Sequence, residues 1–436
     1  MTDRAATSTS DLDPFEALAE AVRASDTVRV SDLLLHHRAL ASRLNDPIPG
    51  SAFGTPVIGP AVQHKNLEMI DLLLRHGADI NARSRWWAGG FGVLDLCDPS
   101  LAPALIERGA RVDAHAAARL GMLSGLDALV TENPGVVHAR GGDGQTPLHF
   151  ASTIEIAEYL LDHGADIDAR DVDHESTAAQ YMVRDRQDVV RVLVQRGCHT
   201  DILMAAALGD IDLLRHYLDS DAGSVRTRVS NTYFPMQDPR AGGTIYIWTL
   251  GGNKSAHVVA RDFGHENVFR LLMDRSPDEL KLAVGCEIGD EDLVNSLIAE
   301  RPNLAQSLSD DDRRKLVDAA ESDNAAAVRL MLAAGWPTDV RGNLGATALH
   351  FAAWHGNAGV VRDLLRSGAP VEARGDRYDL SPLGWALHGS ENSWRRALGD
   401  YAVVVEALLA AGARAPALTP ELEASPAARS ALARFS

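Results

Sequence analysis

The densest group of chemically capable side chains lies in the run DIDARDVDHES, residues 166–176, in which Asp171 and Asp173 precede His174. Carboxylates beside an imidazole can bind a divalent metal or carry out acid and base chemistry. The same run is also consistent with an ordinary polar loop between two structural elements. We favour the loop, expect no metal there, and keep Asp171, Asp173 and His174 as candidate contacts to a partner.

Three other segments combine aromatic with polar side chains, as binding surfaces often do. They add these candidate contacts: Trp86 and Trp87 ahead of a glycine pair, Tyr246 and Trp248 within residues 229–253, and His388, Glu391 and Trp394 within or near residues 388–400. A purely structural role is the competing interpretation for each segment. Trp86 and Trp87 would then simply be exposed at a loop tip, and the other two segments would be long connections.

Composition and motifs narrow the possible functions. The net charge of −18 argues against a general nucleic-acid or membrane-surface binder, since like charges repel. The sequence has no glycine-rich phosphate loop, no HExxH helix and no GxSxG turn, so we expect no cofactor and no classical catalytic site. A small-molecule ligand stays possible.

Cysteine usage and hydropathy predict the compartment. Cys97, Cys198 and Cys286 lie far apart in the sequence, which fits a reducing environment. No apolar run approaches the roughly 20 residues needed to cross a bilayer, and Met1 to Asp13 lacks the apolar core of a secretion signal. We therefore expect a soluble, cytoplasmic protein, with a secreted effector as a weaker alternative.

One apolar pattern recurs along the chain: two apolar residues, two mostly polar residues, then two apolar residues. This spacing forms a stripe on one side of a helix. A glycine commonly follows, where a helix needs a left-handed terminal residue, and both Gly164 to Gly197 and Gly335 to Gly368 span 33 residues. With degenerate copies the chain holds twelve such units. A unit with a single stripe must bury it against neighbours, which predicts a stack of helix pairs.

Two segments carry a family resemblance. Residues 144–168, which contain GQTPLHFA and LLDHGADID, closely resemble the ankyrin repeat, and so does the segment from Gly345 to Glu372. The resemblance extends over roughly residues 15–414. It implies an all-α ankyrin-repeat solenoid of about twelve helix pairs with short β-hairpin fingers between them.

The resemblance also assigns structural roles to several polar residues. Asp166 and Asp168 would occupy routine finger positions, and His149 and His350 would be structural histidines bonded to loop backbone. For the domains we predict a disordered N-terminus at residues 1–13, the solenoid at 14–414, and a C-terminal cap or tail at 415–436.

The spacing of the stripes departs from the period at informative places. Three units have only 24 or 25 residues, which leaves no room for a finger. One interval is 22 residues too long because of residues 229–253, and a second is lengthened by residues 388–400. Within the first insertion, Thr244 to Leu250 is β-branched and aromatic, which predicts a strand with Tyr246 and Trp248 on one face.

These patterns leave two functional hypotheses open. The first, which we favour, is a non-catalytic interaction protein that binds a protein or peptide along the concave face formed by fingers and inner helices. The alternative is an enzyme or small-molecule-binding protein, in which the 229–253 and 388–400 insertions close over a pocket. Long loops in compact repeats are often functional, and this argument applies to both hypotheses.

Overall fold

The computed structural model describes residues 13–435, so the predicted disordered segment lies outside the described residues except for Asp13. The chain forms two compact units. The first comprises the described residues up to Leu214 together with Thr227–Ser255, and the second comprises Arg215–Arg226 and the described residues from Ala256 onward. Each unit is described by itself.

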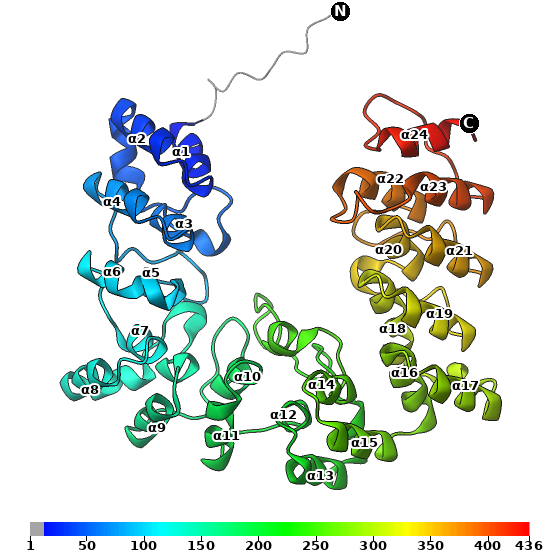
Figure 1. Cartoon of the computed structure of the whole chain (residues 1–436), viewed down its shortest axis with the longest axis horizontal. Helices are drawn as coiled ribbons and strands as arrows, with labels where there is room; N and C mark the ends of the chain where they lie inside the picture. Colours follow the sequence, from blue (N-terminus) through cyan, green and yellow to red (C-terminus); the bar gives the residue numbers. More distant parts are fainter. Residues whose placement is uncertain (1–12, 436) are drawn as a thin grey trace, which may run out of the picture. The chain divides into compact units, whose positions relative to one another are not determined.

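Unit 1 is a series of short helices that pack in chain order (Figure 1). The first helix of each pair contacts the first helix of the next, as α1, α3, α5 and α7 do. Its α-helices are α1 (Pro14–Arg23), α2 (Thr27–His36), α3 (Ile58–Gln63), α4 (Leu67–Arg75), α5 (Val93–Leu96), α6 (Ala102–Glu107), α7 (Ala114–Arg119), α8 (Leu123–Glu132), α9 (Ile154–Asp162), α10 (Ala178–Met182), α11 (Gln187–Gln195) and α12 (Ile202–Leu208). In the fifth pair, the 3₁₀ helix η6 (Pro147–Phe150) replaces the first α-helix.

Unit 2 repeats this arrangement. Its α-helices are α14 (Ala256–Asp262), α15 (Glu266–Arg275), α16 (Asp278–Ile288), α17 (Glu291–Glu300), α18 (Asp310–Glu321), α19 (Ala325–Ala333), α20 (Ala348–Trp354), α21 (Ala358–Arg366), α22 (Pro382–Asn392), α23 (Tyr401–Ala410) and α24 (Pro426–Ala433). The boundary between the units falls inside α13 (Ile211–Ser220). The segment expected to form a cap carries α24, which packs on α22 and α23.

The predicted helical class is confirmed among the described residues. The predicted twelve repeats are confirmed as well, since the helices up to α23 follow as twelve consecutive helix pairs when η6 is included. The apolar stripes form the core. Met69, Ile70 and Leu73 of α4 are completely buried, and so are Val189, Val190 and Leu193 of α11. At about 25 cal/mol per Å² of buried apolar surface, such stripes supply the main driving force for stacking.

Local hydrogen bonds explain where the first helix of a pair begins. Thr347 caps α20, and its backbone N–H and hydroxyl both bond to Nδ1 of His350, at 3.1 and 2.9 Å. The other ring nitrogen of His350 donates to the Leu380 carbonyl at 3.1 Å. His149 repeats the arrangement with Thr146 and the carbonyl of Ser176. The predicted structural role of both histidines is confirmed.

The predicted strand in the first insertion is wrong. Residues Ile247–Gly251 form a π-helical turn, η8, and Trp248 N–H donates to the Ile245 carbonyl at 2.9 Å. The described residues contain isolated β-bridges, such as Arg170 with Thr177, in place of β-hairpin fingers. A strand needs a neighbouring edge to satisfy its backbone groups, and a helical turn satisfies them locally instead.

Candidate functional site

The 229–253 insertion is a closed loop whose two ends meet. Val229 N–H donates to the Lys254 carbonyl at 2.9 Å, and Asn253 N–H donates to the Val229 carbonyl at 2.8 Å. An isolated bridge between Arg228 and Ser255 continues the pairing. The loop therefore leaves and rejoins the repeat stack at one point, and its interior must be held by contacts with the rest of unit 1.

Many of those contacts fall on the turn at residues 171–176, which is part of the run rich in Asp. Gly242 N–H donates to the Asp173 carbonyl at 2.8 Å, and the His174 ring donates from Nδ1 to the Gly243 carbonyl at the same distance. The Glu175 carboxylate accepts from the backbone N–H groups of Gln237 and Asp238, the latter at 2.7 Å. The insertion therefore packs on residues 173–175, which belong to the run that the sequence analysis identified as the densest group of chemically capable side chains.

Asp171 builds this turn. Its carboxylate accepts hydrogen bonds from Ser176 N–H at 2.7 Å, His174 N–H at 2.8 Å and the Tyr181 hydroxyl at 3.0 Å. Burial raises the pKa of Asp171, and the backbone hydrogen bonds from Ser176 and His174 oppose that rise. Because Asp171 is buried and engaged with its own turn, it is not a surface contact, and its candidate role as a direct partner contact is corrected.

Asp143, which the sequence analysis missed, completes the polar cluster. It lies in the 3₁₀ turn η5 (Gly142–Gly144), and its carbonyl accepts from Val172 N–H at 2.8 Å. One ligand atom each from Asp143, Asp173 and His174 lies within 4.8 Å of the other two. Burial raises the pKa of Asp143 to about 6, with the negative charge of Asp173 adding to the rise. Asp143 precedes Asp173 by nearly one repeat, a signal that could have revealed it.

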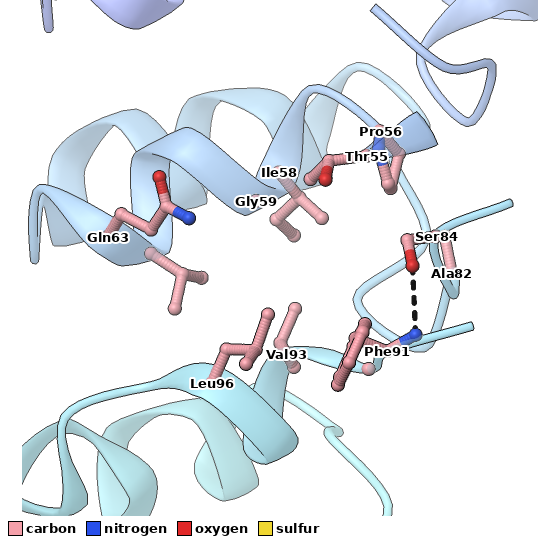
Figure 2. A pocket seen from close by; sticks show the side chains of 12 residues that line it. Thr55, Pro56, Ile58, Gly59, Gln63, Ala82, Ser84, Phe91, Val93 and Leu96 are labelled. Atoms are coloured by element: carbon pink, nitrogen blue, oxygen red, sulfur yellow. Dashed lines mark hydrogen bonds between the residues drawn. The ribbon is translucent and has the colours of Figure 1, made fainter. Parts of the chain in front are cut away.

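Trp86 and Trp87 lie at the tip of a short loop beside this cluster. The loop is closed by two hydrogen bonds between Ser84 and Phe91, one of which Figure 2 shows as a dashed line. Both indoles are half-buried. Trp86 packs edge-on against Phe53, and the Arg240 guanidinium of the insertion lies 4.2 Å from the ring centre of Trp87. The expected exposed tip is therefore partly covered by the insertion.

Tyr246 and Trp248 have opposite environments, which corrects their predicted shared face. Tyr246 is fully buried, and its hydroxyl donates to the Asp201 carboxylate at 2.9 Å. Trp248 is 71% exposed. In a helical turn, residues two apart point in different directions, whereas in a strand they share a face. Tyr246 is therefore a structural anchor and not a partner contact, and it cannot line the pocket that the enzymatic hypothesis required.

The remaining candidates, His388, Glu391 and Trp394, lie in unit 2. The His388 imidazole lies 2.8 Å from the Glu423 carboxylate, and its ring is tilted against that of Trp354. Trp394 is 69% exposed and lies edge-on to His355. Glu391 is also exposed. These candidates and the 229–253 insertion belong to different compact units, so we treat them as two independent surfaces.

Two hollows in unit 1 carry no ligand chemistry. Figure 2 shows the first, of about 30 Å³, where Ile58 and Gln63 face Val93 and Leu96. A cavity of that size holds only one or two water molecules. The second, a groove of about 240 Å³, is lined by Arg83 and Arg111, and its carboxylates are already paired, because Arg83 bonds to Asp95 at 2.9 Å and to Asp113 at 3.3 Å.

Comparison with known families agrees with this architecture. The family of ankyrin repeats in three copies matches residues 114–204 and 280–375, and the single ankyrin repeat matches residues 61–85. No curated protein matches the chain. The chain is an ankyrin repeat protein, a class whose repeats generally mediate protein–protein interaction and are typically non-catalytic. In the described part of the chain, no helix combines the length and the apolar character needed to cross a membrane.

Proposed function

We propose that this chain is a non-catalytic interaction protein that binds a protein or peptide partner along the turns between its repeats and the first helices of its helix pairs, which form the concave face of ankyrin repeats. We further propose that Trp248 provides a main contact. The observation that carries the proposal is the exposure of this large apolar side chain on an insertion that is otherwise firmly held. Long insertions in compact repeats are often functional.

Hydrogen bonds hold the backbone and side chains on both sides of Trp248 in place. Tyr246 is anchored to Asp201, Ile245 N–H donates to the Ser176 hydroxyl at 3.1 Å, and Arg184 donates to the carbonyl of Thr249. An aromatic side chain has few rotatable bonds and loses little conformational entropy on binding, which is one reason that tryptophan and tyrosine are enriched in binding hot spots. Trp248 therefore has the preorganisation expected of an anchor residue.

Charge indicates the chemistry of the partner. The chain carries a net charge of −18, and the turns under the insertion are rich in Asp and Glu. A partner segment with Lys and Arg would be attracted at long range, and its association rate would fall with added salt. A cytoplasmic location also belongs to this proposal, supported by three buried free cysteines that fit a reducing compartment.

Affinity capture from native cells tests the proposal, with three versions of the full chain as bait. Trp248→Ala removes the proposed anchor, and Trp394→Ala is a matched control because its indole is equally exposed but lies in unit 2. We expect partner recovery to fall roughly tenfold or more with Trp248→Ala and to stay near wild type with Trp394→Ala. Equal recovery with folded Trp248→Ala protein would contradict it.

A further inference from the structure

Asp143, Asp173 and His174 form a compact three-ligand cluster at the tips of two successive repeats. One carboxylate oxygen from each aspartate and one imidazole nitrogen lie within 4.8 Å of one another. We propose that these three side chains bind a divalent transition-metal ion, with Zn²⁺ as the best fit. This proposal differs from the expectation, drawn from the sequence, that the run holds no metal, and it is independent of the proposed partner binding.

The state of Asp143 is the second observation that points to a ligand. The residue is only 8% exposed, its Oδ1 atom has no hydrogen bond of normal length, and its carboxylate faces Asp173 and His174. The nearby indole N–H of Trp86 favours the charged form of this carboxylate but does not neutralise it. A buried carboxylate oxygen without a partner is costly, and two carboxylates facing each other add repulsion. A cation between them would satisfy the oxygen and remove the repulsion at once.

His174 is held in the tautomer and orientation of a metal ligand. Its Nδ1 lies 2.8 Å from the Gly243 carbonyl, and because a carbonyl only accepts, Nδ1 carries the proton. In the neutral ring the lone pair is on Nε2, which lies 3.7 Å from Oδ2 of Asp173. Metal-bound histidines almost always donate their second nitrogen to a carbonyl or carboxylate in this way.

The ligand types select the class of metal. Mg²⁺ and Ca²⁺ prefer oxygen ligands alone, whereas one imidazole with two carboxylates suits Zn²⁺ and its first-row neighbours. Ligands about 2.0–2.1 Å from a tetrahedral zinc ion are roughly 3.3 Å apart. The side chains must therefore close by up to about 1.5 Å, which the broad terminal torsions of Asp permit. Water would complete the coordination shell.

Metal binding would also tie down the insertion. Asp173 accepts from Gly242 N–H through its carbonyl, and His174 donates to Gly243, so two of the three ligands already hold the insertion. Asp143 belongs to the preceding repeat. An ion bound by all three side chains would cross-link two repeats and the insertion, and would raise the thermal stability of unit 1.

Calorimetric titration of Zn²⁺ into the full chain, free of affinity tags and stripped with chelator, tests the site. The site variants are Asp143→Asn and His174→Gln. The matched controls are Asp166→Asn, a finger aspartate outside the cluster, and His163→Gln, an exposed histidine whose Nδ1 also bonds to a backbone carbonyl. We expect one Zn²⁺ per chain, an affinity at least about tenfold weaker in both site variants, and no change in the controls.

A melting experiment separates ligation from structural support. Asp143→Asn removes the facing charge but keeps the shape, so it should raise the Tm of the metal-free protein and abolish the further rise caused by Zn²⁺. If His174→Gln fails to fold, the titration and melting of Asp143→Asn still test whether the cluster binds Zn²⁺. The proposal is overturned if Zn²⁺ does not bind, if both variants bind it like wild type, or if Mg²⁺ or Ca²⁺ binds more tightly.

Discussion

The hydroxyl of Tyr246 donates a 2.9 Å hydrogen bond to Asp201, the residue that caps α12 through its bond to Met204 N–H. This bond joins the core of the insertion to the start of a helix in the stack. Tyr246→Phe removes only the hydroxyl and leaves the Asp201 carboxylate without that partner. We expect unit 1 to lose about 1–3 kcal/mol, measured by urea denaturation.

The same variant distinguishes anchoring from recognition. Because Tyr246 is buried, Tyr246→Phe should leave partner recovery intact at temperatures where unit 1 is folded. A large loss of partner recovery from fully folded Tyr246→Phe protein would mean that the hydroxyl itself is recognised, contrary to its burial.

Close packing between successive finger turns is testable at a glycine. Gly144 has φ +71°, and a Cβ there would lie 2.3 Å from a methyl carbon of Val172. Gly164 has φ +88° with no atom within 4 Å of its Cβ position. Both Gly→Ala variants incur backbone strain of about 1 kcal/mol. Gly144→Ala should cost a further 1–3 kcal/mol, roughly, for overpacking.

The measurement is chemical denaturation of the two variants beside wild type. Gly164→Ala serves as the control for strain alone. Equal destabilisation by both substitutions would show that the turn at Gly144 does not pack closely against Val172. It would then contradict the close packing of successive turns on which the insertion rests.

The helical architecture could be predicted from the sequence because its signals are local. The stripe of α11 is apolar at Val189, Val190 and Leu193, and Thr146 and Thr347 mark helix starts through bonds within four residues. These features are determined by neighbours along the chain, and tertiary packing reinforces them.

The site was harder to predict because it depends on contacts distant in sequence. Asp143 meets Asp173 and His174 only when two repeats stack. The β propensity of Thr244 to Leu250 predicted a strand. Burial of Tyr246 against Asp201 favours a helical turn, and the described residues of unit 1 offer isolated bridges but no sheet edge for a strand to join. Strand propensity reflects fit to a pleated surface more than an intrinsic backbone preference.

His350 predicts a pH dependence with a definite sign. Burial lowers its pKa from 6.5 to about 4 in the folded chain. The neutral ring therefore stabilises the fold fully above pH 6.5, and that contribution is lost as the pH falls through the window from 6.5 to 4. At pH 5 the loss amounts to about 2 kcal/mol.

Comparing wild type with His350→Gln isolates this one group from other titrating residues. The destabilisation caused by the substitution should be about 2 kcal/mol smaller at pH 5 than at pH 7.5. Unfolding free energies from urea titrations at the two pH values provide the check. A cost that is independent of pH would mean that His350 titrates normally in the fold.

Hydrogen–deuterium exchange of the full chain, with and without the captured partner, would show whether the partner binds through the insertion. We predict slower exchange on binding at residues 244–251, around the exposed Trp248, with little change at residues 388–400. Slower exchange confined to residues 388–400 would contradict it.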